Sequence, residues 1–366
     1  MTAVTDLGSK ADAAAIAVGA AHPKRPRRGS QRRKGEGLWG WLFMAPVLGL
    51  LLVFLIIPIV LALYVSFTNW NGQGGPFSAS AQRIGLQNYK DLLLEPGLTR
   101  KNFVTSVRNN LYFVLVVVPV QTALALFLAL IVNQRRLRGK GFFRTAFYMP
   151  SVSSSIAISL IFVFLFAQQG AVNRILAWFG FSGRQWFNNG QGTIHAFLAL
   201  FGVEDAPAFL ADHQLLGLSW WDWLSGPSWS MLVIIMLVIW TTSGTFMLMF
   251  LAGLQTVPDE VHEAAAIDGA SRWQAFRQVT LPLLRRHVVL VVTLGLIGTW
   301  QVFDQIYVMS DGAGNTTTPA YLTYTTGIRD SRFGRASAIA FLLFLIILVF
   351  TLVQRVATRE KDGDLL

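Results

Sequence analysis

Long apolar stretches, separated by shorter polar ones, dominate the pattern of this chain. A helix that crosses a lipid bilayer needs about 20 consecutive and largely apolar residues. Six stretches meet this requirement, at residues 38–68, 109–133, 145–167, 229–254, 287–309 and 336–357. They predict an all-α, polytopic membrane protein with six transmembrane helices, in which residues 38–357 form a single membrane domain.

Proline and glycine interrupt three of these predicted spans. Pro58 lies in the first, Pro119 in the second, and Gly295 and Gly298 lie in the fifth. A broken helix frees backbone groups that lipid cannot satisfy, so breaks are tolerated only against other helices or a water-filled cavity. Ordinary helix packing, in which small residues are common, stays open as the alternative to cavity lining.

The composition agrees with a membrane protein. The chain has 366 residues, of which 53% are hydrophobic and only 13% are charged, whereas a soluble domain carries about 25% charged residues. There is no cysteine, so a disulfide framework and a thiolate metal site are both excluded. The histidines have no metal-like spacing, and we expect no metal on this chain; beyond the N-terminal tail they are His195, His213, His262 and His287.

Basic residues flank the spans unevenly, and this decides the predicted orientation. Arginine and lysine favour loops on the cytoplasmic side of a membrane. A basic cluster at 24–34 precedes the first span, and others follow the second, fourth and sixth spans at 135–140, 272–286 and 355–361. All of them fall on one side if the six spans are real. We therefore expect a multi-pass protein of the cell (inner or plasma) membrane with both termini cytoplasmic.

The two terminal stretches carry no predicted span. Residues 1–37 are rich in Ala, Ser, Gly and charge, and we expect a disordered cytoplasmic tail there. Its basic cluster could also indicate nucleic-acid binding. Because an apolar span follows at once, the sequence favours the membrane-orienting role, and we expect no nucleic-acid partner. We expect residues 358–366 to form a short cytoplasmic C-terminus.

The longest predicted loop on the outer side covers residues 168–228. It holds five of the twelve tryptophans of the chain. Tryptophan favours the membrane–water interface, and its ring also stacks well on ligand faces. We expect interface anchoring, with docking to an outside partner as the second interpretation.

The polar segment at 255–284 interrupts the apolar pattern on the opposite side. Pro258 suits the first position of a helix, and Asp259 and Glu260 suit the positive end of its dipole. Gly269 supplies a left-handed helix stop. Ser271 and the glutamine three residues later then form a capping box that starts a second helix, which we expect to run to about Thr280.

This segment is thus predicted to be two short helices with a glycine corner, and one face of the first is apolar and made mostly of small residues. A passive turn back into the membrane needs only a few residues, whereas this segment uses about thirty. The length favours a docking surface for a separate protein over a passive turn.

A specific resemblance supports the docking role. The stretch at 263–284, EAAAIDGASRWQAFRQVTLPLL, resembles the EAA loop of binding-protein-dependent ABC importer permeases. In that family the pattern is E-A-A, a glycine, an aliphatic residue and Leu-Pro. Val279 stands where isoleucine is commoner. The matching positions here are Glu263, Ala264, Ala265, Gly269, Val279, Leu281 and Pro282.

Other stretches resemble the carbohydrate branch of that family, which includes the maltose and glycerol-3-phosphate permeases. The resemblance covers about residues 38–357, but the tail and much of 168–228 lie outside it. The stretches are GLQNYKDLL at 85–93, FRTAFYMPSVSSSIAISLIFVFLF at 143–166, FLAGLQTVPDEVHEAAAIDGA at 250–270 and GTWQVFDQIYVMSDGAGNTTT at 298–318.

The resemblance implies a type I ABC importer permease fold and a set of partners. An extracytoplasmic solute-binding protein delivers the solute to two permease subunits, usually two different chains. Two copies of an ATP-binding ABC subunit drive the pair, and the EAA helix seats in a groove of the ATPase. ATP and magnesium belong to that partner, so no cofactor is expected on this chain. The residues implied in ATPase coupling are Glu263, Ala264, Ala265, Asp268, Gly269 and Ala270.

The chain lacks the motifs of an enzyme. There is no G-x-x-x-x-G-K-[ST] phosphate loop, so we expect no ATP binding and no ATP hydrolysis by this chain. H-E-x-x-H and G-x-S-x-G are also absent. A membrane-embedded enzyme would need converging catalytic groups within spans, and none stands out.

Aromatic and hydrogen-bonding residues at the outer half of the fifth span suit a sugar path. Asp304 is the clearest acid within a span, and it should face the bundle or lie near the outer end. A structural polar network or an interfacial girdle is the alternative. The predicted substrate-path residues are Trp300, Gln301, Phe303, Asp304, Gln305 and Tyr307, with Trp240, Thr241 and Thr242 as further possibilities.

The function favoured by the sequence is therefore a permease subunit that moves a sugar, oligosaccharide or related polyol into the cytoplasm. An ion-coupled secondary transporter of small solutes is the alternative. That class usually shows an internal inverted repeat and intramembrane acids. No repeat is visible, and Asp304 is the one good acid. The sequence does not name the sugar.

Overall fold

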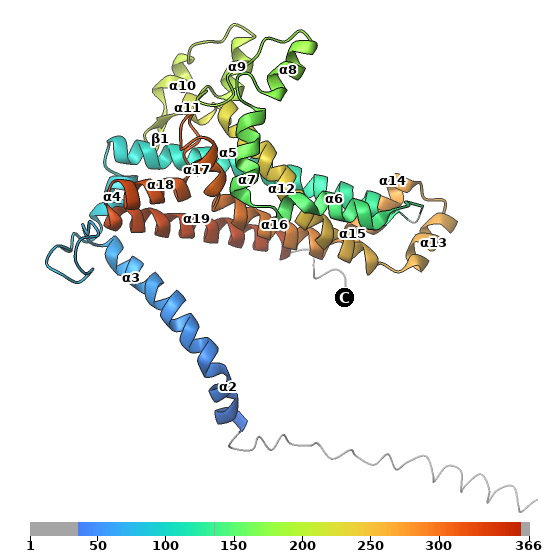
Figure 1. The fold of residues 1–366 in the computed structure, drawn as a ribbon, viewed down its shortest axis with the longest axis horizontal. Coiled ribbons are helices and arrows are strands. Elements are labelled where there is room, and N and C mark those ends of the chain that lie inside the picture. Colours follow the sequence, from blue (N-terminus) through green and yellow to red (C-terminus); the bar gives the residue numbers. More distant parts are fainter. Residues whose placement is uncertain (1–35, 135, 360–366) are drawn as a thin grey trace, which may run out of the picture. The chain divides into compact units, whose positions relative to one another are not determined.

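The computed structural model describes residues 36–134 and 136–359 (Figure 1). Most of the predicted tail, 1–37, and most of the C-terminal stretch, 358–366, lie outside the described residues. The chain divides into two units, Met1–Ile59 and Val60–Leu366.

The described part of the first unit is a continuous apolar helix. It consists of α2 (Glu36–Leu51), a π-helical turn (Leu52–Ile56) and the first residues of α3 (Ile57–Ser66). Pro58 has no N–H to donate to the preceding turn, and the π-helical turn lies directly before it. Every described side chain from 40 to 59 is exposed. A helix that is apolar on all sides suits a lipid or protein environment rather than water.

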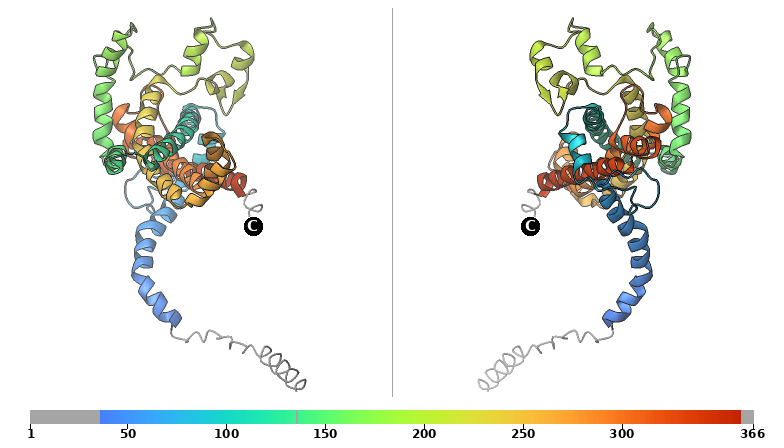
Figure 2. Two further views of the ribbon diagram at one scale, coloured as in Figure 1. Left: turned by 90° about the vertical axis from the view of Figure 1, so that its right-hand side faces the viewer. Right: turned by 90° about the vertical axis from the view of Figure 1, so that its left-hand side faces the viewer.

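The second unit is built around two long helices, α5 (Leu98–Asn133) and α12 (Trp229–Gln255), which pack against each other. Helix α16 (Arg285–Trp300) packs against α5, and α19 (Phe333–Arg359) packs against α16. Helix α6 (Lys140–Val152) covers α12. Figures 1 and 2 show these helices side by side in one bundle. Phe113 of α5 and Ile234 of α12 have no exposed surface, so they belong to its core.

The described residues contain four helices that are long and apolar enough to cross a membrane. Two bent pairs raise the number to as many as six if each pair is one span. One pair joins Lys140–Val152 to Ser155–Leu165 at 93°, and the other joins Arg272–Leu283 to Arg285–Trp300 at 68°. The predicted helical membrane architecture is confirmed at this level.

Two of the predicted spans are not continuous helices. The stretch 145–167 bends between α6 and α7 (Ser155–Leu165), where Ser153 and Ser154 are extended with ψ of 152° and 125°. Serine side chains can hydrogen-bond the local backbone and so compete with the helix, and the Ser153 hydroxyl donates to the Met149 carbonyl at 3.0 Å. The stretch 287–309 breaks at 301–303, between α16 and α17 (Asp304–Met309).

The segment 168–228 forms a small excursion from the bundle, seen at the top of Figure 1. It consists of α8 (Ala171–Trp178), α9 (Thr193–Ala199), α10 (Ala208–Asp212), the antiparallel strands β1 (Gln214–Leu215) and β2 (Leu218–Ser219), and α11 (Trp220–Trp223). Several contacts fasten it to the bundle, among them hydrogen bonds from Arg108, Tyr112 and Ser230. Arg108 donates to the Asp222 carbonyl at 3.0 Å, the Tyr112 hydroxyl donates to the Trp223 carbonyl, and the Ser230 hydroxyl donates to the Trp186 carbonyl at 3.0 Å.

The ends of the bundle carry different elements. At the end here named the α13 end lie α13 (Asp259–Ile267) and α14 (Arg272–Ala275), which a π-helical turn (Phe276–Thr280) and α15 (Leu281–Leu283) connect to α16. At the opposite end, the α18 end, lie α4 (Gln87–Leu93) and α18 (Pro319–Tyr324), and a further π-helical turn (Thr325–Arg329) leads toward α19 (Figure 1).

Candidate functional site

The break between α16 and α17 is held by buried side chains from distant parts of the chain. Asn110 of α5 donates its amide to the Trp300 carbonyl at 3.1 Å, and the Thr318 hydroxyl donates to the Val302 carbonyl at 3.1 Å. Asn110 and Thr318 have no exposed surface. Carbonyl groups released by a break inside an apolar bundle need such partners. The break is therefore part of the fold rather than a loose helix end.

A cavity of about 260 Å³ opens at this break, between α5, α12, α16 and the start of α17. Aromatic rings line one part of it, among them Phe113, Phe246 and Phe303. Its polar lining comes from Gln121, Thr242, Thr299, Gln301, Asp304 and Gln305. Hydroxyl, amide and carboxylate groups beside ring faces can both hydrogen-bond and stack on a polyhydroxylated solute.

A second cavity of about 280 Å³ lies where α6 bends into α7. It shares Thr242, Phe246 and Gln305 with the first cavity, and Ser155 of α7 also lines it. The Gln305 amide donates to the Ser155 hydroxyl at 3.0 Å. The α6–α7 bend and the α16–α17 break thus lie at two neighbouring cavities that share three lining residues.

The structure brings together four of the six predicted substrate-path residues: Gln301, Phe303, Asp304 and Gln305 all line the first cavity. Trp300 is fully buried on another side, where its ring centre lies 5.2 Å from that of Phe350 in α19. Trp300 is therefore separated from the cavity residues.

Of the remaining predicted and possible path residues, some line a cavity and others do not. Tyr307 stacks on Phe303 at 5.6 Å with 41% of its surface exposed, and it does not line the first cavity. Thr242 lines both cavities, Thr241 lines the second, and Trp240 lines neither.

The residues that were predicted to interrupt the spans have different positions relative to the first cavity. Gly295 and Gly298 lie within α16 and line the first cavity. Pro119 lies inside the unbroken helix α5. Gln121, two residues further along α5, lines the first cavity and was missed by the sequence reasoning. Gln121 could have been found in the sequence as a single amide side chain within a strongly apolar stretch. Burying such a polar group in a membrane span is energetically costly.

The 255–284 segment has the predicted corner. The Gly269 N–H donates to the Ala266 carbonyl at 3.1 Å, and the Ala270 N–H donates to the Ala265 carbonyl at 3.0 Å. This is the Schellman pattern, in which the left-handed residue is Gly269 at φ +76°. The Ser271 and Gln274 side chains form the predicted capping box at the start of α14.

The predicted position of Pro258 in the first helix of this segment was wrong. Pro258 occupies the N-cap of α13 with ψ of 142°, and Asp259 is the first helical residue. The fixed φ of proline fits the extended N-cap as well as the first helical turn. Beyond α14, helical turns continue through Leu283, three residues past the predicted end at Thr280.

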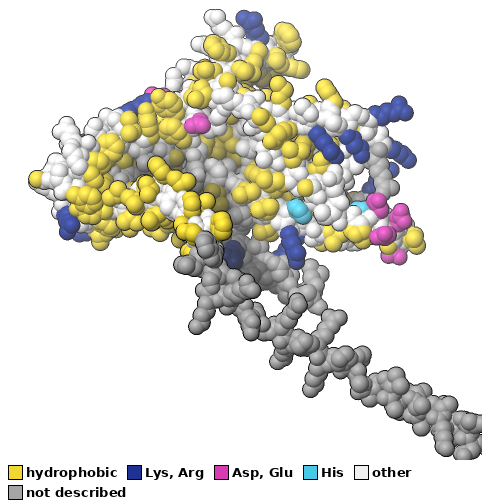
Figure 3. Space-filling model, turned by 60° about the horizontal axis from the view of Figure 1, so that its bottom comes forward, with side chains coloured by type: hydrophobic (Ala, Val, Ile, Leu, Met, Phe, Trp, Pro, Cys, Tyr) yellow, Lys and Arg dark blue, Asp and Glu magenta, His cyan; other side chains and the backbone are white. Residues whose placement is uncertain are grey.

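Most of the predicted coupling residues lie on the surface. Glu263, Ala264, Asp268 and Gly269 are exposed, Ala270 is half-buried, and Ala265 is buried with 9% of its surface exposed. Figure 3 shows acidic side chains gathered at the right-hand end of the molecule, where α13 lies. The helix thus presents a small-residue surface flanked by negative charge.

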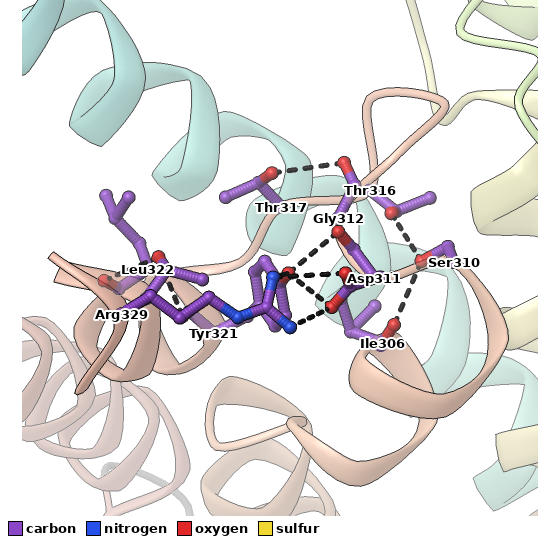
Figure 4. A network of polar contacts seen from close by, with 10 residues as sticks. Ile306, Ser310, Asp311, Gly312, Thr316, Thr317, Tyr321, Leu322 and Arg329 are labelled. Carbon is purple, nitrogen blue, oxygen red and sulfur yellow. Dashed lines mark hydrogen bonds and ion pairs between the residues drawn. The ribbon is translucent and has the colours of Figure 1, made fainter. Parts of the chain in front are cut away.

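A polar network at the α18 end closes the loop that follows α17 (Figure 4). Arg329 pairs with the Asp311 carboxylate at 2.6 Å, and the Tyr321 hydroxyl donates to the same carboxylate at 2.8 Å. The hydrogen bond from Arg329, followed by that from Tyr321, holds the pKa of Asp311 below its usual value. Burial, and then the hydrogen bond to Asp311, raises the pKa of Tyr321 to about 12.

Comparison with known proteins identifies the family. A model of the family described as "Binding-protein-dependent transport system inner membrane component" matches residues 121–361, which is more than half of the chain. The chain belongs to this family of membrane transport components. The predicted membership in the binding-protein-dependent permeases is confirmed.

Several similar curated proteins are sugar permeases by name. The lactose transport system permease protein LacF of Rhizobium radiobacter is 29% identical over 88% of this chain and 94% of its own length. The multiple sugar-binding transport system permease protein MsmF of Streptococcus mutans is 30% identical over 86% and 93%. The trehalose/maltose transport system permease protein MalF of Thermococcus litoralis is 30% identical over 91% and 98%.

Solved structures share the fold. A chain of a bacterial ABC transporter involved in the import of the acidic polysaccharide alginate matches with a TM-score of 0.66 at 20% identity, covering 89% of this chain and 99% of that chain. A chain of an alginate ABC transporter in complex with a pentasaccharide-bound periplasmic protein matches with a TM-score of 0.67 at 18% identity, covering 88% and 94%. The chain thus shares the fold of these two transporter chains.

Proposed function

We propose that this chain is the transmembrane permease subunit of an ATP-driven ABC importer that moves a carbohydrate into the cytoplasm. One observation carries the proposal within the family fold. The bend between α6 and α7 and the break between α16 and α17 meet at two cavities whose shared lining is Thr242, Phe246 and Gln305. Irregular backbone at membrane depth that lines a polar cavity is typical of solute sites in transporters.

The proposed energy-supplying partner is a separate ATPase that binds α13. The sequence has no phosphate loop of its own. Helix α13 is exposed at one end of the bundle, and the capping box of Ser271 and Gln274 begins α14 directly after the corner. Because α14 leads through α15 into α16, a push on α13 would reach the helix that ends at the cavity. We propose that Glu263, Ala264, Ala265, Asp268, Gly269 and Ala270 form the coupling surface.

The remaining partners follow from this assignment. Two copies of the ATPase would hold ATP and Mg²⁺, and a second permease subunit would complete the translocation path. An extracytoplasmic solute-binding protein would deliver the carbohydrate. With the α13 end in the cytoplasm, six spans would give both termini a cytoplasmic location, and the excursion 168–228 would lie on the outer side. Exposed Trp178 and Phe179 on that excursion suit the outer membrane interface.

A second candidate function rests on Asp304. This acid lines the first cavity, and intramembrane acids serve ion coupling in secondary transporters. An ion-coupled transporter would need neither an ATPase nor a binding protein. The two functions therefore differ in what must be present for uptake.

The deciding experiment is uptake by the purified assembly in proteoliposomes. A tagged chain is expressed with the candidate ATPase and second permease, and copurification is scored first. Accumulation of radiolabelled lactose, maltose and trehalose is then measured with internal ATP, with a non-hydrolysable ATP analogue, and with an ion gradient alone. We expect accumulation only with ATP and an added binding protein. Accumulation by this chain alone on an ion gradient would refute the proposal.

A further inference from the structure

Gln121 of α5 holds its amide group between two other helices of the bundle. The side chain has no exposed surface. One end of the amide meets Thr242 of α12, where the Thr242 hydroxyl and Gln121 Oε1 are 2.7 Å apart. The other end, Nε2, has no hydrogen-bond partner among the described residues. A buried amide with an unpaired end is costly and calls for an explanation.

The unpaired end does not depend on how the amide is turned. The Thr242 hydroxyl has one proton and two acceptors, Gln121 Oε1 and the Val238 carbonyl, each at 2.7 Å. If the amide turns over, Nε2 donates to the Thr242 oxygen, and the Thr242 proton goes to Val238. Oε1 is then the unpaired end. In either orientation, Thr242 satisfies one end of the amide and the other stays available.

The available end lies beside Gly295 of α16. A Cβ atom at Gly295 would overlap with Gln121 Nε2, so the absence of a side chain there leaves room for the amide. Gln121, Thr242 and Gly295 all line the first cavity. Phe113 and Phe303 supply ring faces in the same lining. The free amide end and the rings together match a solute that carries both hydroxyl groups and apolar ring faces.

We propose that the free end of the Gln121 amide binds a hydroxyl group of the carbohydrate during its passage through this cavity. Gln121 is thereby a specificity-determining residue of the permease. An amide can donate or accept, and so can a hydroxyl, so the pair forms in both orientations of Gln121. This inference rests on the proposed function as a carbohydrate permease.

A matched pair of variants tests the hydrogen bond. Gln354 of α19 donates to the Thr293 hydroxyl at 2.9 Å and does not line the first cavity, so Gln354→Leu is the control for Gln121→Leu. We expect Gln121→Leu to lower the maximal rate of ATP-driven uptake by about three- to tenfold, the value of one hydrogen bond. Assembly and the KM for the loaded binding protein should not change. Gln354→Leu should transport at the wild-type rate.

A second measurement separates solute contact from a structural role. The chain has no cysteine, so Gln121→Cys carries a unique thiol. In the assembled complex we expect a positively charged methanethiosulfonate reagent to modify this thiol in at least one nucleotide state. The transported sugar, supplied with its binding protein, should slow the reaction. Gln354→Cys should show no such protection.

The results of these experiments distinguish failure of the inference from failure of the proposed function. If the wild-type complex accumulates lactose, maltose or trehalose but Gln121→Leu matches its rate, the inference is overturned and the proposed function stands. Equal losses in both leucine variants, or a Gln121→Cys thiol that the sugar does not protect, also overturn the inference. If this chain alone accumulates sugar on an ion gradient without ATP, the proposed function fails and the inference, which rests on it, fails with it.

Discussion

Gly244 of α12 lies directly against the backbone carbonyl of Phe147 in α6. A Cβ atom at Gly244 would overlap with that carbonyl oxygen and would lie 2.7 Å from the Ser151 hydroxyl. Small residues allow helix backbones to approach closely in membrane bundles. This contact fixes α6 just before the bend into α7, and the bend lines the second cavity.

Replacing Gly244 with valine should separate α6 from α12. Overpacking of a close contact costs about 1–3 kcal/mol, and more where backbone is involved. We expect Gly244→Val to lower the melting temperature of the detergent-purified chain and its yield. Gly49→Ala is the control, because nothing lies within 4 Å of a Cβ at Gly49. Equal melting temperatures for Gly244→Val and Gly49→Ala would contradict the packing role.

Asn110→Leu should weaken the break between α16 and α17. This change leaves the buried Trp300 carbonyl without the amide that now donates to it at 3.1 Å. An unsatisfied buried group costs about 1–3 kcal/mol, which a thermal unfolding curve can resolve. Ser159→Ala is the matched control, since the Ser159 hydroxyl is buried and already has no partner among the described residues. We expect Ser159→Ala to be neutral or slightly stabilising.

The pH dependence of the Asp311 network has a definite sign. The pKa of Asp311 is held below its usual value, first by the hydrogen bond from Arg329 and then by that from Tyr321. Its contribution to stability is therefore fully present above about pH 4 and is lost as the pH falls through the lowered pKa. Both partners of the ion pair are about half exposed, so the contribution is small.

Melting temperatures of the wild-type chain and Asp311→Asn test this sign. We expect a constant difference between about pH 5 and pH 8 and a shrinking difference below about pH 4. The Tyr321 hydroxyl keeps its proton across this range, because its pKa is raised to about 12. A difference that grows as the pH falls would have the wrong sign.

Two predicted path residues that lie four positions apart, Trp300 and Asp304, should behave differently. Asp304 lines the first cavity, so Asp304→Asn should change the uptake rate while the complex still assembles. Trp300 has no exposed surface and packs on Phe350, so Trp300→Ala should instead destabilise the chain by about 3–5 kcal/mol. The check is uptake per folded molecule beside a melting temperature for each variant. Unchanged uptake by Asp304→Asn across the sugars tested would place the path elsewhere.

The local features of the fold could be predicted because their causes are local. The apolar runs locate the helices, Gly269 locates the corner, and Ser271 with Gln274 locates the next helix start. Each depends on residues within a few positions of one another. The docking role of 255–284 stays a prediction, since it concerns a partner chain.

The break between α16 and α17 could not be predicted because one of its causes is distant in sequence. The break at 301–303 depends on Asn110, which lies 190 positions before Trp300. The environment of Gln121 depends on Thr242, 121 positions away, and on Gly295. Apolar run length cannot distinguish a continuous span from one whose carbonyl groups are satisfied by other helices.

Gly269 offers the sharpest test of coupling, because its role is confined to the backbone. It has φ of +76°, and nothing lies within 4 Å of a Cβ placed there, so a side chain would meet no steric clash with its surroundings. A β-branched residue strongly disfavours this left-handed conformation, whereas asparagine tolerates it. We expect Gly269→Val to abolish ATP-driven uptake while the chain remains in the membrane, and Gly269→Asn to retain most of it. Copurification of the ATPase should fall in parallel with uptake. Normal uptake by Gly269→Val would show that the corner does not transmit the ATPase stroke, and uptake lost equally in both variants would show that backbone conformation is not the cause.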